Sequence, residues 1–584
     1  MLDLIIRGGT VVDGTGAAPF RADVGVKDGR IAAVGVDLGP ARREIDAAGH
    51  YVTPGWVDIH THYDGQATWD PELEPSFSSG VTTVIAGNCG VGFAPVRPGM
   101  QQRLIDLMEG VEDIPGTALH VGMKWNWTTF TEYLDTLDAM PRTMDVGCLV
   151  PHGPLRLWAM GDRVGSDKCA TGEDLAEMKA QLEEAMRAGA FGLASSRTPI
   201  HRTLQGEMTP DFNVDLPELV ALIEVVRAHG GIFQVVPTGI SGEDMVGLRN
   251  DMAMIEEIAA RTGVHTHVLM FQTASEPDYY LEQLDTLERI NRVAPTTAQF
   301  GGRGTGSIVG FLGMHPFMGR PTFIRMAQEH DRADWLEQLA RPDVRAAILA
   351  ETSLPGSRGA IYELAFDRMF DLGPDLDYEP ERERSLAAMA EASGKTVEEA
   401  VYDFMLEHSV HPRLYIAYNN YCGGDLEPVR TSLGRDHVVL SASDAGAHVQ
   451  SVCDGSIHSF MLTHWVRDRQ RGPRIPLETV VNWLTQKAAR SVGLTDRGVI
   501  APGLKADINV FALDKLKVCP PEIRDDLPGG AYRLLAPVVG YRATMVSGVV
   551  TRENDVATGA LPGRLVRYQA ASMPPSTGST TPVM

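Results

Sequence analysis

Residues 51–65 read YVTPGWVDIHTHYDG, an apolar run that closes on two histidines, His60 and His62. Side chains two residues apart on a strand project to the same face, so these two imidazoles can bind one metal ion. Paired histidines at a strand end can also simply hydrogen-bond at a surface, and the motif alone is compatible with both interpretations. The surrounding sequence has to decide between them.

Short apolar runs alternate with helical patterns over most of the chain. Asp28-Gly29 is typical of a tight type I′ hairpin within residues 1–54, because both central residues of that turn need positive φ. From residue 55 to about 490 the alternation predicts a parallel sheet. The eight expected strands are Val57–His62, Thr82–Gly87, Asp145–Pro151, Phe191–Ser196, Ile232–Val236, His265–Phe271, Thr296–Phe300 and Val438–Asp444, with Leu414–Tyr418 competing for the seventh place. A helix is expected over 174–188, and another after a capping box at Thr396.

Composition and charge limit the class of partner. The 584 residues carry 52 Lys+Arg against 76 Asp+Glu, a formal charge of −24. Nucleic acid and anionic membranes require clustered cations, so neither is expected as a partner. No leader pattern and no run of ~18 apolar residues occurs, so a cytoplasmic location is expected. Six cysteines, at 89, 148, 169, 422, 453 and 519, are too scattered for a disulfide framework.

Several segments resemble a known family. Beside the histidine motif they are GNCGVGFAP at 87–95, VVLSASDAGAH at 438–448 and the β-patterned stretches at 484–514 and 540–554. Together they resemble the amidohydrolase superfamily, and GNCGVGFAP narrows the resemblance to relatives of N-acyl-D-amino-acid deacylases. The resemblance implies an α/β fold, with a (β/α)8 TIM-like barrel over 55–494 and a small β-sandwich formed by 1–54 and 495–566. Residues 353–385 are then an insertion over the barrel mouth, and the Pro/Ser/Thr-rich 567–584 a disordered tail.

The carboxyl ends of barrel strands meet at one mouth, where the resemblance places a metal site. Its expected ligands are His60, His62, Cys89 and Asp444. Nitrogen, thiolate and carboxylate ligands together favour Zn²⁺, which lowers the pKa of a bound water toward ~7. Asp444 would take the proton of this water and pass it to the leaving nitrogen. A structural aspartate and a buried free cysteine are the alternatives for Asp444 and Cys89.

Two positions depart from the family pattern. Characterised D-aminoacylases carry a histidine on strand five and a Ser-His-x-Lys motif on strand six, where this chain has Gln234 and then Met270 and Gln272. Both ligands and the lysine for the substrate carboxylate are therefore absent, which favours one ion over two and a less cationic pocket. The candidate substrate-binding residues are Tyr63, His152, Arg197, His201, Gln234, Gln272 and His448. Arg197 would either clamp a substrate carboxylate or pair with a neighbouring acidic loop.

The sequence thus predicts a metal-dependent hydrolase that cleaves a linear amide C–N bond of a small molecule, such as an N-acyl amino acid or a bulkier amide. Hydrolysis of a cyclic amide, an ester or a carbamate is an alternative. A ligand-binding protein on a degraded barrel is another, although the joint retention of His60, His62, Cys89 and Asp444 counts against decay. A homo-oligomer is compatible with the sequence.

Overall fold

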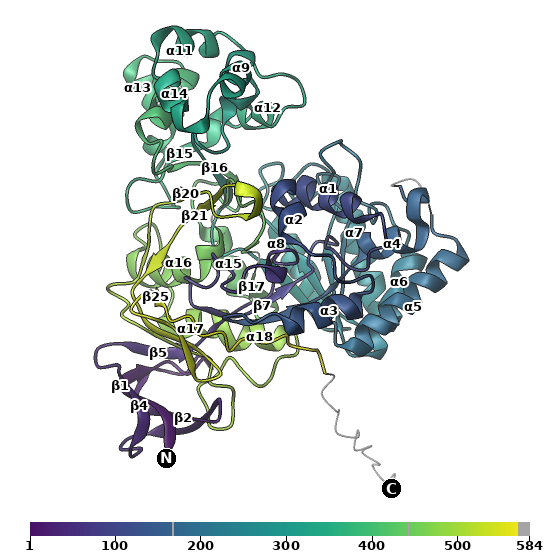
Figure 1. The fold of residues 1–584 in the computed structure, drawn as a ribbon, viewed down its shortest axis with the longest axis vertical. Coiled ribbons are helices and arrows are strands. Elements are labelled where there is room, and N and C mark those ends of the chain that lie inside the picture. Colours follow the sequence, from purple (N-terminus) through teal and green to yellow (C-terminus); the bar gives the residue numbers. More distant parts are fainter. Residues whose placement is uncertain (166–168, 442, 453, 570–584) are drawn as a thin grey trace.

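Two parallel sheets, covered by helices, form the centre of this α/β protein in the computed structural model (Figure 1). The structure describes residues 1–165, 169–441, 443–452 and 454–569. One sheet contains β6 (Trp56–Asp58), β7 (Val81–Ala86) and β8 (Asp145–Cys148). The other contains, in this order, β9 (Val150–Pro151), β10 (Gly192–Ser196), β11 (Ile232–Val236), β12 (His265–Leu269), β13 (Thr296–Phe300) and β17 (Val438–Leu440).

The two sheets are linked at both ends. Strands β8 and β9 are consecutive pieces of chain, separated only by Leu149. Thr61, after β6, forms a parallel bridge with Ala445, after β17. Strand β13 pairs with both β12 and β17, which confirms Thr296–Phe300 over its competitor. The competing segment is β16 (Leu414–Asn419), which belongs to a separate antiparallel sheet.

Helices follow the strands as the sequence alternation predicts. Around the two sheets lie α1 (Gln101–Glu112), α2 (Gly116–Gly122), α3 (Phe130–Ala139), α4 (His152–Met160), α5 (Gly172–Ala188), α6 (Leu216–Ala228), α7 (Met245–Thr262), α8 (Tyr279–Asn291), α15 (Glu427–Leu433), α16 (Ile457–Phe460), α17 (Leu477–Asn482) and α18 (Ala488–Ser491). Helix α5 buries the expected apolar face, including Met178 and Leu182. Among the described residues, no helix is both long enough and apolar enough to cross a membrane.

The chain between β13 and β17 builds a helical lobe above this body (Figure 1). It contains β14 (Thr305–Val309), α9 (Pro321–Glu329), α10 (Trp335–Leu339), α11 (Pro342–Leu349), α12 (Arg358–Glu363), β15 (Met369–Asp371), α13 (Leu386–Ser393), α14 (Val397–Glu407) and β16. The capping box predicted at Thr396 is confirmed at the start of α14. The lobe has an apolar core of its own, so the insertion expected at 353–385 is only part of a larger unit.

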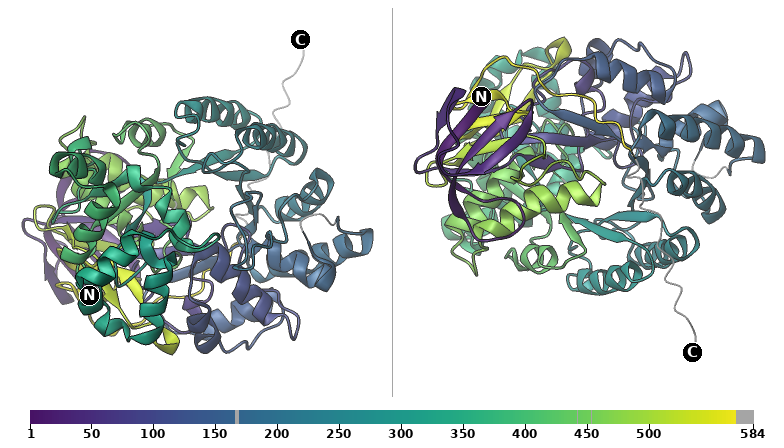
Figure 2. Two further views of the ribbon diagram at one scale, coloured as in Figure 1. Left: turned by 90° about the horizontal axis from the view of Figure 1, so that it is seen from above. Right: turned by 90° about the horizontal axis from the view of Figure 1, so that it is seen from below.

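Seen from above, the lobe covers the half of the molecule that holds the N-terminal strands (Figure 2). Helices α5 and α6 extend from the other half. The lobe is joined to the body by an ion pair between Arg358 and Asp113, and by Arg332, whose guanidinium lies 4.6 Å from the ring centre of Tyr532. These contacts place the lobe next to the loop that follows α1 and next to Tyr532.

Strands from both ends of the chain share one sheet. Its members are β1 (Leu2–Val11), β2 (Phe20–Lys27), β3 (Arg30–Gly35), β4 (Ala41–Asp46), β5 (Tyr51–Pro54), β18 (Ile508–Phe511), β23 (Tyr541–Val546), β24 (Val549–Glu553) and β25 (Val556–Ala557). Strand β5 pairs antiparallel with β18 and so joins the two ends. Asp28 and Gly29, with φ of 51° and 74°, form the predicted hairpin turn between β2 and β3.

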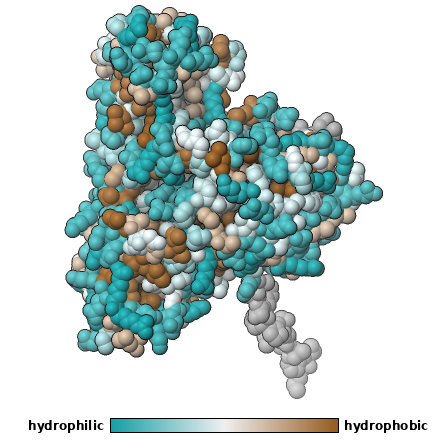
Figure 3. Space-filling view, viewed as in Figure 1, coloured by the Kyte–Doolittle hydropathy of each residue, from teal (hydrophilic) through white to brown (hydrophobic). Residues whose placement is uncertain are grey.

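Two short ribbons and the last described residues complete the body. The ribbons pair β19 (Lys517–Val518) with β22 (Val538–Val539), and β20 (Glu522–Arg524) with β21 (Arg533–Leu535). Hydrophobic residues gather near these C-terminal strands on the face drawn in Figure 3, whereas hydrophilic residues cover the top of the lobe. Of the tail expected at 567–584, residues 570–584 lie outside the described residues. Tyr568 packs on the body, and its N–H donates to Gly189 O at 2.8 Å.

Candidate metal centre

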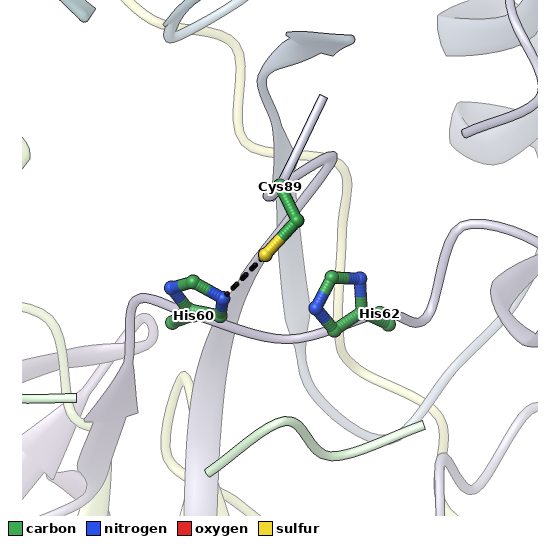
Figure 4. A group of neighbouring side chains, drawn as sticks. All are labelled: His60, His62 and Cys89. Atoms are coloured by element: carbon green, nitrogen blue, oxygen red, sulfur yellow. Dashed lines mark hydrogen bonds between the residues drawn. The ribbon is translucent and has the colours of Figure 1, made fainter. Parts of the chain in front are cut away.

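Side chains from three loops meet after the ends of β6, β7 and β17. Strand β6 ends at Asp58 and β17 at Leu440, so both strands are shorter than the sequence predicts. The expected ligands therefore lie in the loops just after the strands. Nε2 of His60 lies 3.2 Å from Sγ of Cys89 and 3.3 Å from Oδ1 of Asp444. Nε2 of His62 lies 3.7 Å from the same oxygen. Figure 4 shows both rings and the thiol turned toward a common centre.

Left-handed backbone conformations occur at two of these positions. Cys89 has a φ of 57° and Asp444 a φ of 46°. For residues with a Cβ this conformation costs on the order of 1 kcal/mol, and such residues cluster at functional sites where the surrounding fold over-determines them. His448, four residues after Asp444, shares it with a φ of 47°.

The protonation states at the centre suit a metal ion. Burial lowers the pKa of His60 to about 4 and that of His62 well below its usual value, so both rings are neutral as ligands must be. Burial also raises the pKa of the Cys89 thiol, and the carboxylates of Glu112 and Asp444 raise it further. A divalent cation reverses this effect by stabilising the thiolate.

Unsatisfied polar atoms point to the same ion. Neither ring nitrogen of His62 has a hydrogen-bond partner, although the residue is buried. Buried polar atoms in folded proteins are normally satisfied, so an orphaned imidazole facing a thiol and a carboxylate calls for a ligand. Two imidazoles, one thiolate and one carboxylate are a donor set that zinc accepts. The residues therefore fit a zinc ion.

Gln299, from β13, fixes the ring of His60. Its Oε1 lies 2.8 Å from Nδ1 of His60. Because this oxygen only accepts, Nδ1 carries the proton and the lone pair of Nε2 faces Cys89 and Asp444. Nε2 of Gln299 in turn lies 3.3 Å from Nδ1 of His267, whose Nε2 bonds Ser491 O at 2.9 Å. His267 is therefore an outer partner of the centre.

The comparison with known families agrees with this geometry. A sequence model described as "Amidohydrolase family" matches residues 43–552. The chain belongs to the amidohydrolase family. The resemblance found in the sequence is thereby confirmed, and it covers the loops that carry all four candidate ligands.

Several relatives are named as aminoacylases or deacylases. Over 233 residues the amidohydrolase is 34% identical to a D-aminoacylase of Alcaligenes xylosoxydans xylosoxydans, a match that spans 40% of this chain and 43% of the relative. It is 27% identical to an N-acyl-D-aspartate deacylase of the same organism, over 87% of this chain and 85% of that protein. The solved N-acyl-D-glutamate deacylase of Bordetella bronchiseptica, a complex with zinc and a phosphonate inhibitor, superposes with a TM-score of 0.63 at 24% identity over 97% and 99% of the chains. This last likeness establishes the fold.

Two glutamines hold loops of the amidohydrolase. Oε1 of Gln234 accepts the N–H of Cys89 at 3.0 Å, while its buried Nε2 has no partner. Oε1 of Gln272 accepts the N–H of Cys422 at 3.2 Å, and its own N–H donates to Asn420 at 2.8 Å. Gln234 thus contacts the loop of Cys89, whereas Gln272 contacts the 420–422 segment.

Three other residues expected to bind substrate are engaged inside the protein. The hydroxyl of Tyr63 is fully buried and bonds Leu73 O and Ser76 Oγ. His152 lies between Ser195 Oγ and Glu218 Oε1, at 3.0 Å from each. Arg197 pairs with Asp251 at 3.0 Å and donates to Val214 O at 2.8 Å, so it has an acidic partner, although this acid lies on helix α7 and not on a loop. Each of these side chains therefore has polar partners within the protein.

His201 and His448 border the metal centre. Nδ1 of His201 bonds Ser196 Oγ at 2.8 Å, which leaves Nε2 for other contacts. Burial lowers the pKa of His201 to about 3, and proximity to His448 and His60 adds to this shift. His448 is a third exposed, and its Nε2 lies 3.6 Å from Oε2 of Glu112. Both histidines therefore remain candidates for substrate contact.

Glu112 is a site residue that the sequence analysis missed. It ends α1, is 2% exposed, and places Oε1 3.5 Å from Nδ1 of His62. Burial raises the pKa of Glu112 well above its usual value, and the charges of Asp444 and Asp64 add to the effect. No motif marks this position, because it is one of several acids on an amphipathic helix between β7 and β8.

Proposed function

We propose that the protein is a metal-dependent hydrolase that cleaves a linear amide C–N bond of a small molecule. The convergence of His60, His62, Cys89 and Asp444 after three strand ends carries this proposal. The names of two relatives, a D-aminoacylase and an N-acyl-D-aspartate deacylase, support the same bond type.

These four residues would hold one zinc ion. When bound, zinc polarises a scissile carbonyl and lowers the pKa of water toward ~7. Asp444, whose pKa burial raises to about 6, accepts the proton of the attacking water and returns it to the leaving nitrogen. One ion is favoured because Gln234 and Met270 occupy the strand positions that would supply further ligands, and neither an amide nor a thioether is a usual zinc ligand.

The charges around the centre support a neutral amide substrate. The acids that raise the pKa of Cys89 are Glu112, Asp444, Asp211 and Asp64. Two arginines near strand ends are neutralised, Arg197 by Asp251 and Arg303 by Asp454. A substrate carboxylate would therefore meet several acids, and neither of these two arginines is free to bind it. We expect bulky or uncharged amides to be better substrates than small N-acyl amino acids.

The proposal also includes a closed barrel. The bridge between Thr61 and Ala445 and the continuity of β8 with β9 support a single (β/α)8 barrel made from the two parallel sheets. The sheet shared by both chain ends would then be the small β-sandwich domain beside it. Closure of the barrel is what brings Cys89 and Asp444 to one mouth.

Activity on a substrate panel tests the function. Zinc-loaded protein is assayed with N-acyl-D- and N-acyl-L-amino acids and with uncharged long-acyl amides, and Asp444→Asn is assayed in parallel. We expect zinc-dependent amide hydrolysis that Asp444→Asn abolishes. If the protein hydrolysed only cyclic amides, esters or carbamates, the proposed bond type would be wrong. If it bound a ligand tightly without turnover, it would be a binding protein.

A further inference from the structure

We infer that Glu112 is a positioning residue whose carboxylate orients His62 for the metal ion and ties this ligand to His448 at the mouth. The inference rests on the proposed function, because it requires an ion bound by His62. Its basis is the pair of contacts that one buried side chain makes with two histidines from different loops.

The contact with His62 lies on the side of the ring away from the centre. Oε1 of Glu112 is 3.5 Å from Nδ1, whereas Nε2 of the same ring is 3.7 Å from Oδ1 of Asp444. A carboxylate that is ionised beside a bound cation accepts only, so it favours the tautomer with the proton on Nδ1 and leaves the lone pair of Nε2 for the metal. Gln299 faces Nδ1 of His60 from the corresponding side, at a hydrogen-bond distance of 2.8 Å. The centre therefore has a neutral outer partner for one histidine and an acidic one for the other.

The contact with His448 connects Glu112 to the loop that carries Asp444. The carbonyl of Glu112 accepts the N–H of His448 at 2.5 Å, and Oε2 lies 3.6 Å from its Nε2. The same loop is held to the first strand, since His62 N–H donates to Ala445 O at 2.8 Å. One acid thus links the end of α1, a metal ligand and the loop of the general base.

The burial of Glu112 argues against a purely structural role. It is 2% exposed, and its Oε1 has no hydrogen bond within the described structure. An unsatisfied buried carboxylate destabilises a fold unless a positive partner is supplied. A metal-bound His62 is such a partner, because the cation polarises the Nδ1–H that faces Glu112.

Zinc affinity of the intact protein tests the inference. The dissociation constant is measured by competition with a chromophoric chelator for wild type and Glu112→Gln, together with the stoichiometry and the visible spectrum of the cobalt-substituted protein. We expect one ion in both, a dissociation constant raised about 10–100-fold in Glu112→Gln, and an altered cobalt spectrum. Glu109→Gln, on the same helix, is the matched control and should leave the constant unchanged. Circular dichroism of the metal-free proteins establishes that the variants fold.

The outcomes separate the inference from the function on which it rests. A wild type that binds no metal contradicts the proposed function. If the wild type binds zinc and Glu112→Gln has a dissociation constant within threefold of it and an unchanged cobalt spectrum, the inference is overturned and the proposed function stands. Two ions in wild type and one in Glu112→Gln would make Glu112 a ligand and also overturn it. If Glu112→Gln does not fold, Glu112→Asp takes its place, because it moves the carboxylate back by one methylene. An unchanged zinc dissociation constant and cobalt spectrum in that variant would also overturn the inference.

Discussion

Oε1 of Gln234 accepts the backbone N–H of Cys89 at 3.0 Å and thereby fixes the turn that carries the thiol. Cys89 has a left-handed φ of 57°, which a non-glycine residue keeps only when its neighbours hold it. The glutamine thus supports the centre from the strand on which characterised D-aminoacylases carry a histidine. In this chain Gln234 on strand five therefore holds the loop of a candidate ligand in place.

Replacing the thiol tests whether Cys89 is a ligand. Cys89→Ser should weaken zinc binding by on the order of 100-fold, because losing a ligand costs at least as much as losing an outer partner. Cys148→Ser is the matched control, since Cys148 is also a buried free cysteine near a strand end. Competition titration gives both constants. Equal zinc affinities in the two variants would show that Cys89 packs beside the ion without binding it.

Asp444→Asn should lower kcat by about 10²–10⁴-fold, because an amide cannot accept the proton of the attacking water. Substrate KM should change far less, since the change removes an interaction made in the transition state. Steady-state kinetics at saturating zinc separate the two parameters. A variant that keeps a tenth or more of the wild-type kcat would remove Asp444 from its role as base.

Substrate charge gives a third prediction. kcat/KM for a long-acyl or aryl amide without a carboxylate should exceed that for N-acetyl-D-methionine. Arg197→Met should lower stability through loss of the Asp251 pair but leave the KM for N-acetyl-D-methionine unchanged. A preference for the small anion, together with a raised KM in Arg197→Met, would show that Arg197 binds the substrate carboxylate after all.

Much of the fold follows from local sequence patterns. The βα alternation and the hairpin at Asp28-Gly29 are encoded by periodicity and turn chemistry, which act over a few residues. The lobe between β13 and β17 was underestimated, because its helices are short and some, such as α10 (Trp335–Leu339), span a single turn. Its separate core arises from contacts between distant segments that no local period reports.

Only some residues of the candidate site could be predicted from the sequence. His60, His62, Cys89 and Asp444 lie in recognisable motifs at strand ends, so their convergence could be predicted. Glu112 and Gln299 could not, because each is a common residue whose role depends on which atom it faces. The partners of Tyr63 and His152 within the protein could not be predicted from the sequence, whereas pairing of Arg197 with a neighbouring acid was one of its two expected roles.

A buried ion pair away from the centre should control stability in acid. Glu379 and Arg469 pair at 2.9 Å. Despite burial, hydrogen bonds from His464 and Arg469 hold the pKa of Glu379 to about 2. A carboxyl with a lowered pKa stabilises the fold above its unfolded pKa of ~4.3, and this contribution is lost as the pH falls toward 2.

The variant Glu379→Gln isolates this contribution. It should be destabilised by on the order of 3 kcal/mol at pH 7, and the difference from wild type should shrink between pH 4.5 and pH 2. Urea unfolding across this range measures it. A difference that stays constant with pH would mean that the charge of Glu379 contributes nothing.

Metal content measured together with activity tests the central claim most directly. Protein purified without chelators is analysed for transition metals, stripped, and then reloaded with zinc while amide hydrolysis is followed. The structure predicts about one zinc-like ion per chain, loss of hydrolysis on stripping, and recovery at one equivalent of zinc for wild type but not for His60→Ala/His62→Ala. Full hydrolysis by protein free of transition metal would contradict it.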